Sequence, residues 1–146
     1  MIIKLLMNKN KGDEFMQECL FCKIIKGELP SSTVYEDDLI KIIMNINPST
    51  NGHLLILPKE HYVNIMDIDS KIVAHSIEVT RDKIYPILKE KLNCEGITIA
   101  ENNELGQEIK HFHIHLIPRY PNDGADISYS NNDVADVGEI FEKITN

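Results

Sequence analysis

The chain has 146 residues, of which 42% are hydrophobic and 26% are charged, and this composition is ordinary for one globular domain with a single core. No apolar run approaches the roughly 20 residues that a membrane-spanning helix needs, so we expect no membrane partner. The net charge of −8 excludes a broad basic face, and with it a nucleic acid partner. Any phosphate must be bound by donors aimed at it locally.

The three cysteines do not indicate a disulfide-rich secreted domain, because their number is odd and Cys19 and Cys22 form a C-x-x-C pair. We therefore expect a reducing, cytoplasmic setting. Residues 1–15 are too short and too lightly charged for a secretory signal and are expected to be a flexible leader. Residues 16–146 are expected to form a single domain, since no repeat or linker divides them.

Hydrophobic periodicity and turn residues predict three helices in chain order. A short helix from Phe21 ends at Gly27. A long amphipathic helix covers 69–92, with Asp69 or Ser70 as its cap and a kink at Pro86. A final amphipathic helix covers 134–144, with Asp133 as its cap.

Five β-branched or apolar runs predict five strands. The first two, within 33–38 and 39–46, are joined by a turn at Asp37–Asp38, and the others are 53–58, 96–100 and 108–118. Short connections favour antiparallel pairing, with the first three strands consecutive and the last two hairpin-like. The fold class is therefore α+β: a five-stranded antiparallel sheet with one main helix on one face and short helices near both ends.

Three of the six histidines alternate within the last predicted strand, as His111, His113 and His115. Alternate side chains of a strand share a face and lie about 7 Å apart. The three imidazoles should therefore line one face of the sheet, while Phe112, Ile114 and the following leucine pack under the long helix. A surface strand that carries histidines by chance is a poor explanation for three at strict alternation.

The H-x-H-x-H run followed by two apolar residues resembles the signature of the histidine triad family. The similarity extends over residues 19–120, through "CLFCKIIKGELPSSTVYEDD", "NGHLLILPKEH" and "GQEIKHFHIHLIPRY" in the expected order. It is closest to the bacterial members of the Hint-like branch of nucleotide hydrolases. The tail after Tyr120 carries no recognisable motif.

The resemblance implies catalytic roles for three histidines. His113 matches the nucleophile that attacks the α-phosphorus of a nucleotide and forms a nucleotidyl-histidine intermediate, which water then hydrolyses. His115 matches a donor to the phosphoryl oxygens, on which charge develops. His53 matches the histidine that backs the nucleophile and helps to hold its tautomer, although a histidine at a strand edge can also be purely structural.

The resemblance also implies a set of nucleotide-binding residues. Asn45 falls where the family contacts the ribose, and Gln107 and His115 are candidates for phosphate contacts. The family places an amide eleven residues before the first triad histidine, where this chain has Ala100. If the loop is two residues shorter than usual, Asn102 takes that role, and we expect that it does.

A zinc site needs two ligands besides the C-x-x-C pair. In several bacterial relatives these are the histidine of "PKEH", here His61, and the first triad histidine, here His111. The resemblance thus implies a closed Cys19, Cys22, His61, His111 set for structural zinc, and it makes His111 a ligand instead of a catalyst. A thiol pair without metal and a redox pair are the alternatives.

The resemblance therefore implies a hydrolase or transferase acting at the α-phosphorus of purine nucleotides, with a nucleoside phosphoramidate as substrate. The resemblance implies a homodimer, which an exposed fourth strand and the long helix would form. A dinucleoside polyphosphate hydrolase, such as one acting on diadenosine tetraphosphate, would use the same residues. A nucleotide-binding regulatory module with little activity and a metal-buffering protein are alternatives of other classes.

Overall fold

The computed structural model describes residues 19–126 and 134–146. The predicted leader at 1–15, the predicted domain start at 16 and the predicted helix cap Asp133 lie outside these ranges. In the part of the chain that is described, no helix is long and apolar enough to cross a membrane.

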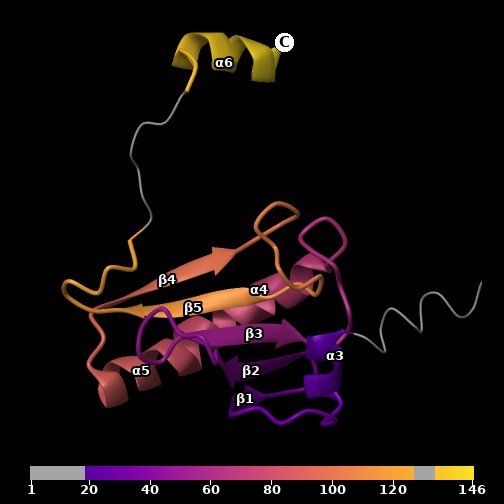
Figure 1. Cartoon of the computed structure of the whole chain (residues 1–146), viewed down its shortest axis with the longest axis vertical. Helices are drawn as coiled ribbons and strands as arrows, with labels where there is room; N and C mark the ends of the chain where they lie inside the picture. The colour runs from indigo at the N-terminus through magenta and orange to yellow at the C-terminus, as the bar shows by residue number, and fades with distance from the viewer. Residues whose placement is uncertain (1–18, 127–133) are drawn as a thin grey trace, which may run out of the picture.

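A five-stranded sheet organises the chain, in the spatial order β1-β2-β3-β5-β4, with every neighbouring pair antiparallel. Its strands are β1 (Thr33–Glu36), β2 (Ile40–Met44), β3 (Leu54–Pro58), β4 (Gly96–Glu101) and β5 (Ile114–Arg119). The helical segments are α3 (Leu20–Ile25), α4 (Ser70–Val79), the π-helical turn η1 (Thr80–Ile84), α5 (Tyr85–Leu92) and α6 (Val137–Thr145). The predicted α+β class and antiparallel sheet are confirmed (Figure 1).

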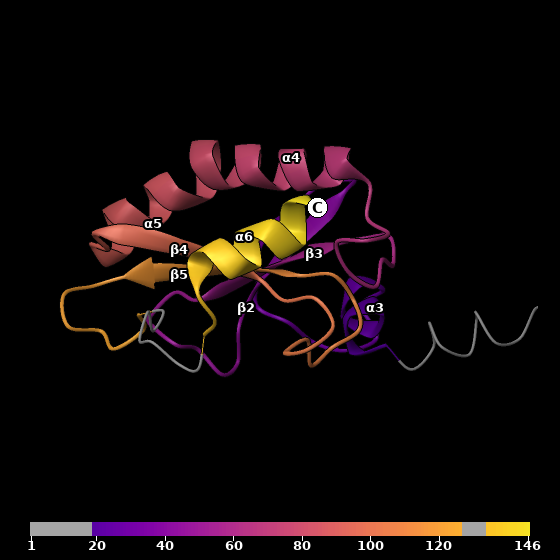
Figure 2. The same cartoon turned by 90° about the horizontal axis from the view of Figure 1, so that it is seen from above.

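The two faces of the sheet are covered by different helices, as Figure 2 shows from above. On one face Ile42, Ile56 and Leu116 pack against residues of α4, η1 and α5. On the other face Leu55 and Leu57 of β3 pack against Phe21 and Ile24 of α3. β3 is buried at all five positions, which explains why its sequence, LLILP, is apolar without alternation.

The long helix is interrupted before Pro86 by the π-helical turn η1. Proline has no N–H to donate to the carbonyl four residues earlier, and its ring needs space there. A wider turn supplies that space without ending the helix, so the predicted kink takes the form of η1. Asp69 caps α4 as predicted, accepting from the N–H of Lys71 at 2.9 Å.

The sequence predicts a fifth strand that begins at Glu108, whereas β5 begins at Ile114. Continuing the register of β5 along β3 would place Phe112 opposite Pro58, and proline cannot donate to a ladder. The N–H of Phe112 instead donates to the carbonyl of Tyr62 at 2.7 Å. His111 and His113 therefore precede the strand, while Phe112 and Ile114 still point into the core under α4.

The last helix also differs from its predicted bounds. It begins at Val137, and Asp136 caps it by accepting from the N–H groups of Gly138 and Glu139. Val134 lies before the helix, and no residue of α6 is buried. The amphipathic pattern thus predicted the helix correctly but began it too early.

Candidate functional site

The predicted catalytic histidines lie together on the face of the sheet that α3 covers in part. His53, His113 and His115 line a cavity of about 790 Å³. The wall formed by α3 and β2 is largely apolar, with Phe21 and Ile24 among its residues. Another part of the lining comes from the loop between β4 and β5, through Asn102, Gly106, Glu108 and Ile109.

His113 has one ring nitrogen engaged and the other available. Its Nδ1 lies 2.8 Å from the carbonyl oxygen of His111. A carbonyl only accepts, so Nδ1 carries the proton and Nε2 has an unprotonated lone pair in the neutral ring. The side chain is buried, and Phe21 packs edge-on against the ring at 5.1 Å between centroids. This tautomer is the one that a nitrogen nucleophile requires.

His53 and His115 form a second, connected pair. The backbone N–H of Ser49 donates to His53 Nδ1 at 3.0 Å, so neutral His53 carries its proton on Nε2. His53 Nε2 then donates to His115 Nδ1 at 2.9 Å. It follows that His115 carries its proton on Nε2. Across residues 19–126 and 134–146 no protein group accepts from that nitrogen, so it is available to a ligand.

Burial keeps this pair uncharged at neutral pH. Loss of solvent lowers the pKa of His53 below its usual range. Burial, reinforced by repulsion from His113 and His53, lowers the pKa of His115 to about 4. His115 is therefore a neutral N–H donor over the physiological range.

The position of His53 differs from the role predicted for it. The expectation was a hydrogen bond that backs the nucleophile, but His53 contacts His115, and the carbonyl of His111 holds the tautomer of His113. The participation of Ser49 was not predicted, because a backbone amide leaves no signal in the sequence. Phe21, which lies between the two cysteines, was also missed.

The structure brings two of the predicted nucleotide-binding amides to the cavity. Asn45 accepts from the N–H of Asn47 at 2.9 Å through Oδ1. Its Nδ2 lies 3.4 Å from His53 Nε2, but both nitrogens bear protons, so this contact is not a hydrogen bond. Asn102 is exposed and lines the cavity, whereas Ala100 on β4 does not.

Gln107 is buried and does not line the cavity. Its Nε2 donates to the carbonyl oxygens of Val63 at 2.5 Å and Ile109 at 3.1 Å, and its Oε1 accepts from the N–H of Glu104 at 3.2 Å. These bonds use both N–H groups of the amide. In this arrangement Gln107 fixes the shape of the β4–β5 loop. To contact a phosphate, its side-chain amide would have to break these hydrogen bonds.

Four potential metal ligands, one of them the first triad histidine, meet where α3 reaches the sheet. The donor atoms of Cys19, Cys22, His61 and His111 all lie within 4.8 Å of one another. Cys22 Sγ lies 3.2 Å from His61 Nδ1 and 3.6 Å from His111 Nδ1, and Cys19 Sγ lies 3.5 Å from His111 Nδ1. Around a tetrahedral zinc ion, with Zn–S about 2.3 Å and Zn–N about 2.0–2.1 Å, sulfur and nitrogen ligands lie about 3.5 Å apart.

The surroundings of His111 fit a ligand role. Its Nε2 donates to the carbonyl of Pro58 at 2.9 Å, which leaves Nδ1 unprotonated and turned toward the cysteines. Burial lowers the pKa of His111 to about 4, so the ring is neutral. Burial and the neighbouring Cys19 raise the pKa of the Cys22 thiol to about 12, a cost that a cation at this position would remove.

Comparisons with known proteins identify relatives of this chain. The family model described as the HIT domain matches residues 26–122. An uncharacterised HIT-like protein of Methanocaldococcus jannaschii is 38% identical over 128 residues, which cover 86% of this chain and 98% of that protein. The range that the family model matches contains the positions of the three alternating histidines.

Two solved structures share the fold. A histidine triad nucleotide-binding protein from Candida albicans has a TM-score of 0.72 at 31% identity, covering 87% of this chain and 94% of its own. A zinc-bound histidine triad family protein from Mycobacterium smegmatis has a TM-score of 0.69 at 32% identity, covering 82% of this chain and 86% of its own.

Proposed function

The chain belongs to the HIT family of nucleotide-binding hydrolases and transferases, and from this premise we propose that it hydrolyses purine nucleotides at the α-phosphorus through a nucleotidyl-histidine intermediate. The observation that carries the proposal is the set of hydrogen-bond partners that assigns complementary tautomers to two histidines in one cavity. His113 presents a lone pair at Nε2, and His115 presents an N–H at Nε2. A nucleophile and a donor are what a phosphoryl displacement needs.

In the first step His113 Nε2 attacks the α-phosphorus, and the bond from phosphorus to the leaving group breaks. The leaving group departs with the bonding electron pair and takes a proton from water. The carbonyl of His111 stabilises the positive charge that develops on the ring of His113, because it accepts from Nδ1–H. The N–H of His115 donates to oxygen or to the leaving atom, where negative charge increases.

In the second step water attacks the same phosphorus, and the bond to His113 Nε2 breaks with its electron pair returning to the ring. The proton that this water loses neutralises the hydroxide formed in the first step. The products are a nucleoside monophosphate and free enzyme. The apolar wall that contains Phe21 and Ile24 suits a nucleobase, and Asn45, with Nδ2 available, suits a ribose hydroxyl. Asn102 is the proposed phosphate contact. Gln107 can contact the phosphate only if its side-chain amide releases the carbonyl groups of Val63 and Ile109.

The charge of the cavity supports a nucleoside phosphoramidate as substrate more than a dinucleoside polyphosphate. Among the described lining residues Glu108 is the one charged side chain, and none is lysine or arginine. The nearby ammonium of Lys110 donates to the carbonyls of Glu104 and Gln107 within the loop. A chain of four phosphates would find no cation there, whereas an amine leaving group adds no negative charge.

The proposal is tested by comparing kcat/KM on adenosine phosphoramidate and on diadenosine tetraphosphate, together with the variant His113→Ala. We expect the phosphoramidate to be favoured, and we expect His113→Ala to lose turnover while it retains nucleotide binding. Persistent turnover in His113→Ala would contradict the mechanism. A wild-type protein that binds nucleotides but turns over neither substrate would indicate a regulatory binding module instead.

We further propose that Cys19, Cys22, His61 and His111 hold a structural zinc ion. The zinc would tie α3, and with it Phe21, to the sheet; four protein ligands leave no position for a reactive water. We expect about one equivalent of zinc per chain in protein purified without added metal. The variant Cys22→Ser should lose it and melt at a lower temperature, whereas Cys94→Ala should keep it. A content below about a tenth of an equivalent would contradict the site.

A homodimer in a cytoplasmic setting completes the proposal. β4 is an edge strand in the sheet order, and its Ile99 is 45% exposed, which supports pairing with a second copy. The three cysteines are free thiols, which suits a reducing compartment. Light scattering coupled to gel filtration is expected to give twice the chain mass.

A further inference from the structure

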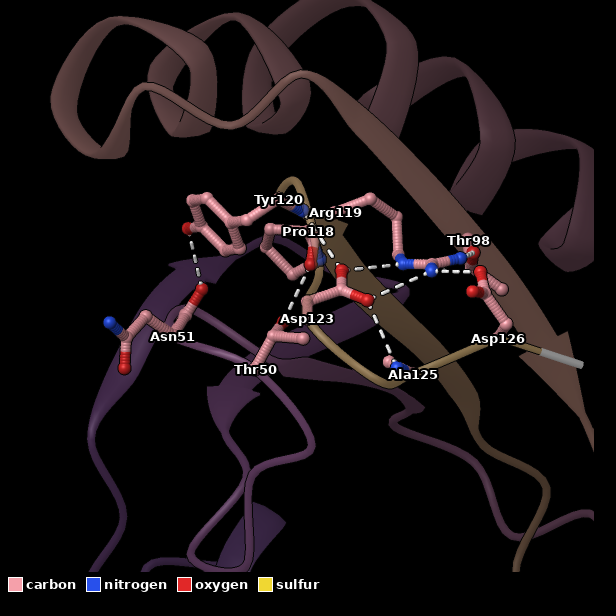
Figure 3. A network of polar contacts seen from close by, with 9 residues as sticks. All are labelled: Thr50, Asn51, Thr98, Pro118, Arg119, Tyr120, Asp123, Ala125 and Asp126. Atoms are coloured by element: carbon pink, nitrogen blue, oxygen red, sulfur yellow. Dashed lines mark hydrogen bonds and ion pairs between the residues drawn. The ribbon is translucent and has the colours of Figure 1, made fainter.

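The turn between β2 and β3 is tied to the end of β5 by two side-chain hydroxyls. Thr50 is 9% exposed, and its hydroxyl donates to the carbonyl of Pro118 at 2.6 Å. The hydroxyl of Tyr120 donates to the carbonyl of Asn51 at 2.8 Å. Figure 3 shows both bonds, which join residues about 70 positions apart in the chain.

Tyr120 is held by a charged network at the end of β5. Asp123 accepts from Arg119 Nε at 2.8 Å and Nη2 at 3.0 Å, and from the backbone N–H of Tyr120 at 2.9 Å. Arg119 also donates to Thr98 on β4 at 3.0 Å. These contacts are drawn in Figure 3. They attach Tyr120 to β4 and β5 without involving the turn between β2 and β3.

The turn has little room to move. Gly52 has a φ of +85°, and a Cβ at that position would lie 2.5 Å from the side chain of Leu92 and 3.3 Å from Pro118. Glycine therefore allows a close approach to α5 that other residues would prevent. Thr50 is held from a second side as well, since its carbonyl accepts from the N–H of His53 at 3.2 Å.

The same turn carries the amide that determines the tautomer of His53. Ser49, next to Thr50, donates its N–H to His53 Nδ1 at 3.0 Å. His53 in turn donates to His115 at 2.9 Å. A neutral imidazole has one N–H, so a change of proton at either ring reverses the donor and acceptor roles of the other.

We propose that Thr50 and Tyr120 are positioning residues for His115: they hold the Ser49 N–H on His53 and thereby keep the proton of His115 on Nε2. The effect on the protonation pattern rests on the geometry alone, and the effect on catalysis rests also on the proposed function. Released from Ser49, His53 can place its proton on Nδ1. His115 would then donate from Nδ1 and turn a lone pair toward the phosphate, where it repels oxygen.

Two variants remove one hydroxyl each: Thr50→Val, which keeps the shape of the side chain, and Tyr120→Phe. Thr50→Ser restores the donor and should restore wild-type behaviour. The matched controls are Thr80→Val and Tyr85→Phe. Thr80 is 3% exposed and donates to the carbonyl of Ser76 on the helical side of the sheet, and Tyr85 packs there too.

The first readout is the ¹⁵N spectrum of the histidine rings in the free protein. Wild type, Thr50→Ser and both controls should show Nε2–H at His53 and His115, while Thr50→Val and Tyr120→Phe should show a mixture of tautomers. The second readout is kcat on two AMP derivatives, an amine phosphoramidate and the p-nitrophenyl ester. We expect a loss of about tenfold or more with the amine and less than about twofold with the better leaving group, which needs less help from His115.

A folded Thr50→Val/Tyr120→Phe double variant that keeps Nε2–H at His115 would overturn the proposal. If Thr50→Val does not fold, Tyr120→Phe supplies the same measurement, because its hydroxyl lies at the surface. Equal losses on both substrates with unchanged ring spectra would also overturn it. Wild-type protein inert toward both substrates would instead overturn the proposed function, and the ring spectra would still decide the positioning of His115.

Discussion

At the scale of single residues, the chemistry of the site depends on which ring nitrogens carry protons. His113 and His115 are two positions apart and their ring centroids are 5.1 Å apart, yet they have opposite tautomers. The carbonyl of His111 accepts a hydrogen bond from Nδ1–H of His113, and Nδ1 of His115 accepts one from Nε2–H of His53. One cavity therefore receives a lone pair and an N–H at neighbouring positions.

The carboxylate of Glu108 is expected to limit which leaving groups the cavity accepts. Among the described residues that line the cavity, Glu108 is the one charged side chain, and lysine at this position would be a cation. We expect Glu108→Lys to raise the ratio of kcat/KM for diadenosine tetraphosphate to that for adenosine phosphoramidate about tenfold, which corresponds to about 1.4 kcal/mol. Steady-state kinetics on both substrates measure this ratio.

The matched control for this substitution is Glu104→Lys. Glu104 is exposed on the same loop but does not line the cavity, so the net charge of the molecule changes equally. If the ratio of kcat/KM for the two substrates changes equally in both variants, the selectivity comes from the overall charge of the molecule and not from Glu108. No change in either would contradict a role for Glu108.

The sequence predicted which side chains gather at the site better than it predicted their partners. His53, His113 and His115 were expected together and lie together. The bond from His53 to His115, and the internal bonds of Gln107, depend on where backbone amides and carbonyls point. Those directions arise from the folded loops and leave no trace in residue types.

At the scale of elements, two prolines explain the late start of the fifth strand and the form of the predicted kink in the long helix. Pro58 ends the ladder between β3 and β5, so His111 and His113 lie before the strand. This frees the backbone carbonyl of His111 for His113. Pro86 is accommodated by η1. Periodicity located the strand and the helix, but it does not report how the chain satisfies a missing N–H.

The turn that joins β1 to β2 is fastened to α4 by Asp37. Its carboxylate accepts from His75 Nε2 at 2.6 Å and from the hydroxyl of Tyr35 at 2.8 Å, and it also accepts from the N–H groups of Leu39 and Ile40. Burial raises the pKa of Asp37. The hydrogen bonds from His75 and from the two backbone amides outweigh this effect and hold the pKa well below its usual range.

Asp37→Asn is therefore expected to destabilise the fold in a pH-dependent way. A depressed folded-state pKa contributes stability above the unfolded value of about 3.9, and that stability is lost as the pH falls through the folded value. At pH 7 the variant should lose about 1 kcal/mol in the free energy of unfolding, a modest figure because the site is partly exposed. Urea titrations at several pH values measure the difference.

The difference in the free energy of unfolding between wild type and Asp37→Asn should become smaller below about pH 4, where the carboxylate of the unfolded chain becomes protonated. A gap that stays constant from pH 7 to the acid limit would contradict the contribution of the charge. Asp38→Asn is the control, since no side-chain bond joins Asp38 to α4 in the described part of the chain.

At the scale of the whole molecule, the net charge of −8 acts on every anionic ligand in addition to Glu108. Long-range repulsion is screened by salt, whereas hydrogen bonds inside the cavity are screened much less. Raising the ionic strength from about 0.02 M to about 0.2 M should therefore lower the inhibition constant of ATP severalfold and leave that of adenosine nearly unchanged. A higher inhibition constant of ATP at high salt would indicate a cationic binding site, which the described cavity lacks.

The central claim is that His113 becomes covalently bound to the nucleotide during turnover. The most direct test mixes the protein with adenosine phosphoramidate, stops the reaction within the first turnover in alkaline denaturant, and measures the intact mass and the modified peptide. Wild-type protein should carry one adenylyl group on His113, and His113→Ala should carry none and turn over no substrate. An adenylyl group on another residue, or steady turnover by His113→Ala, would contradict the account.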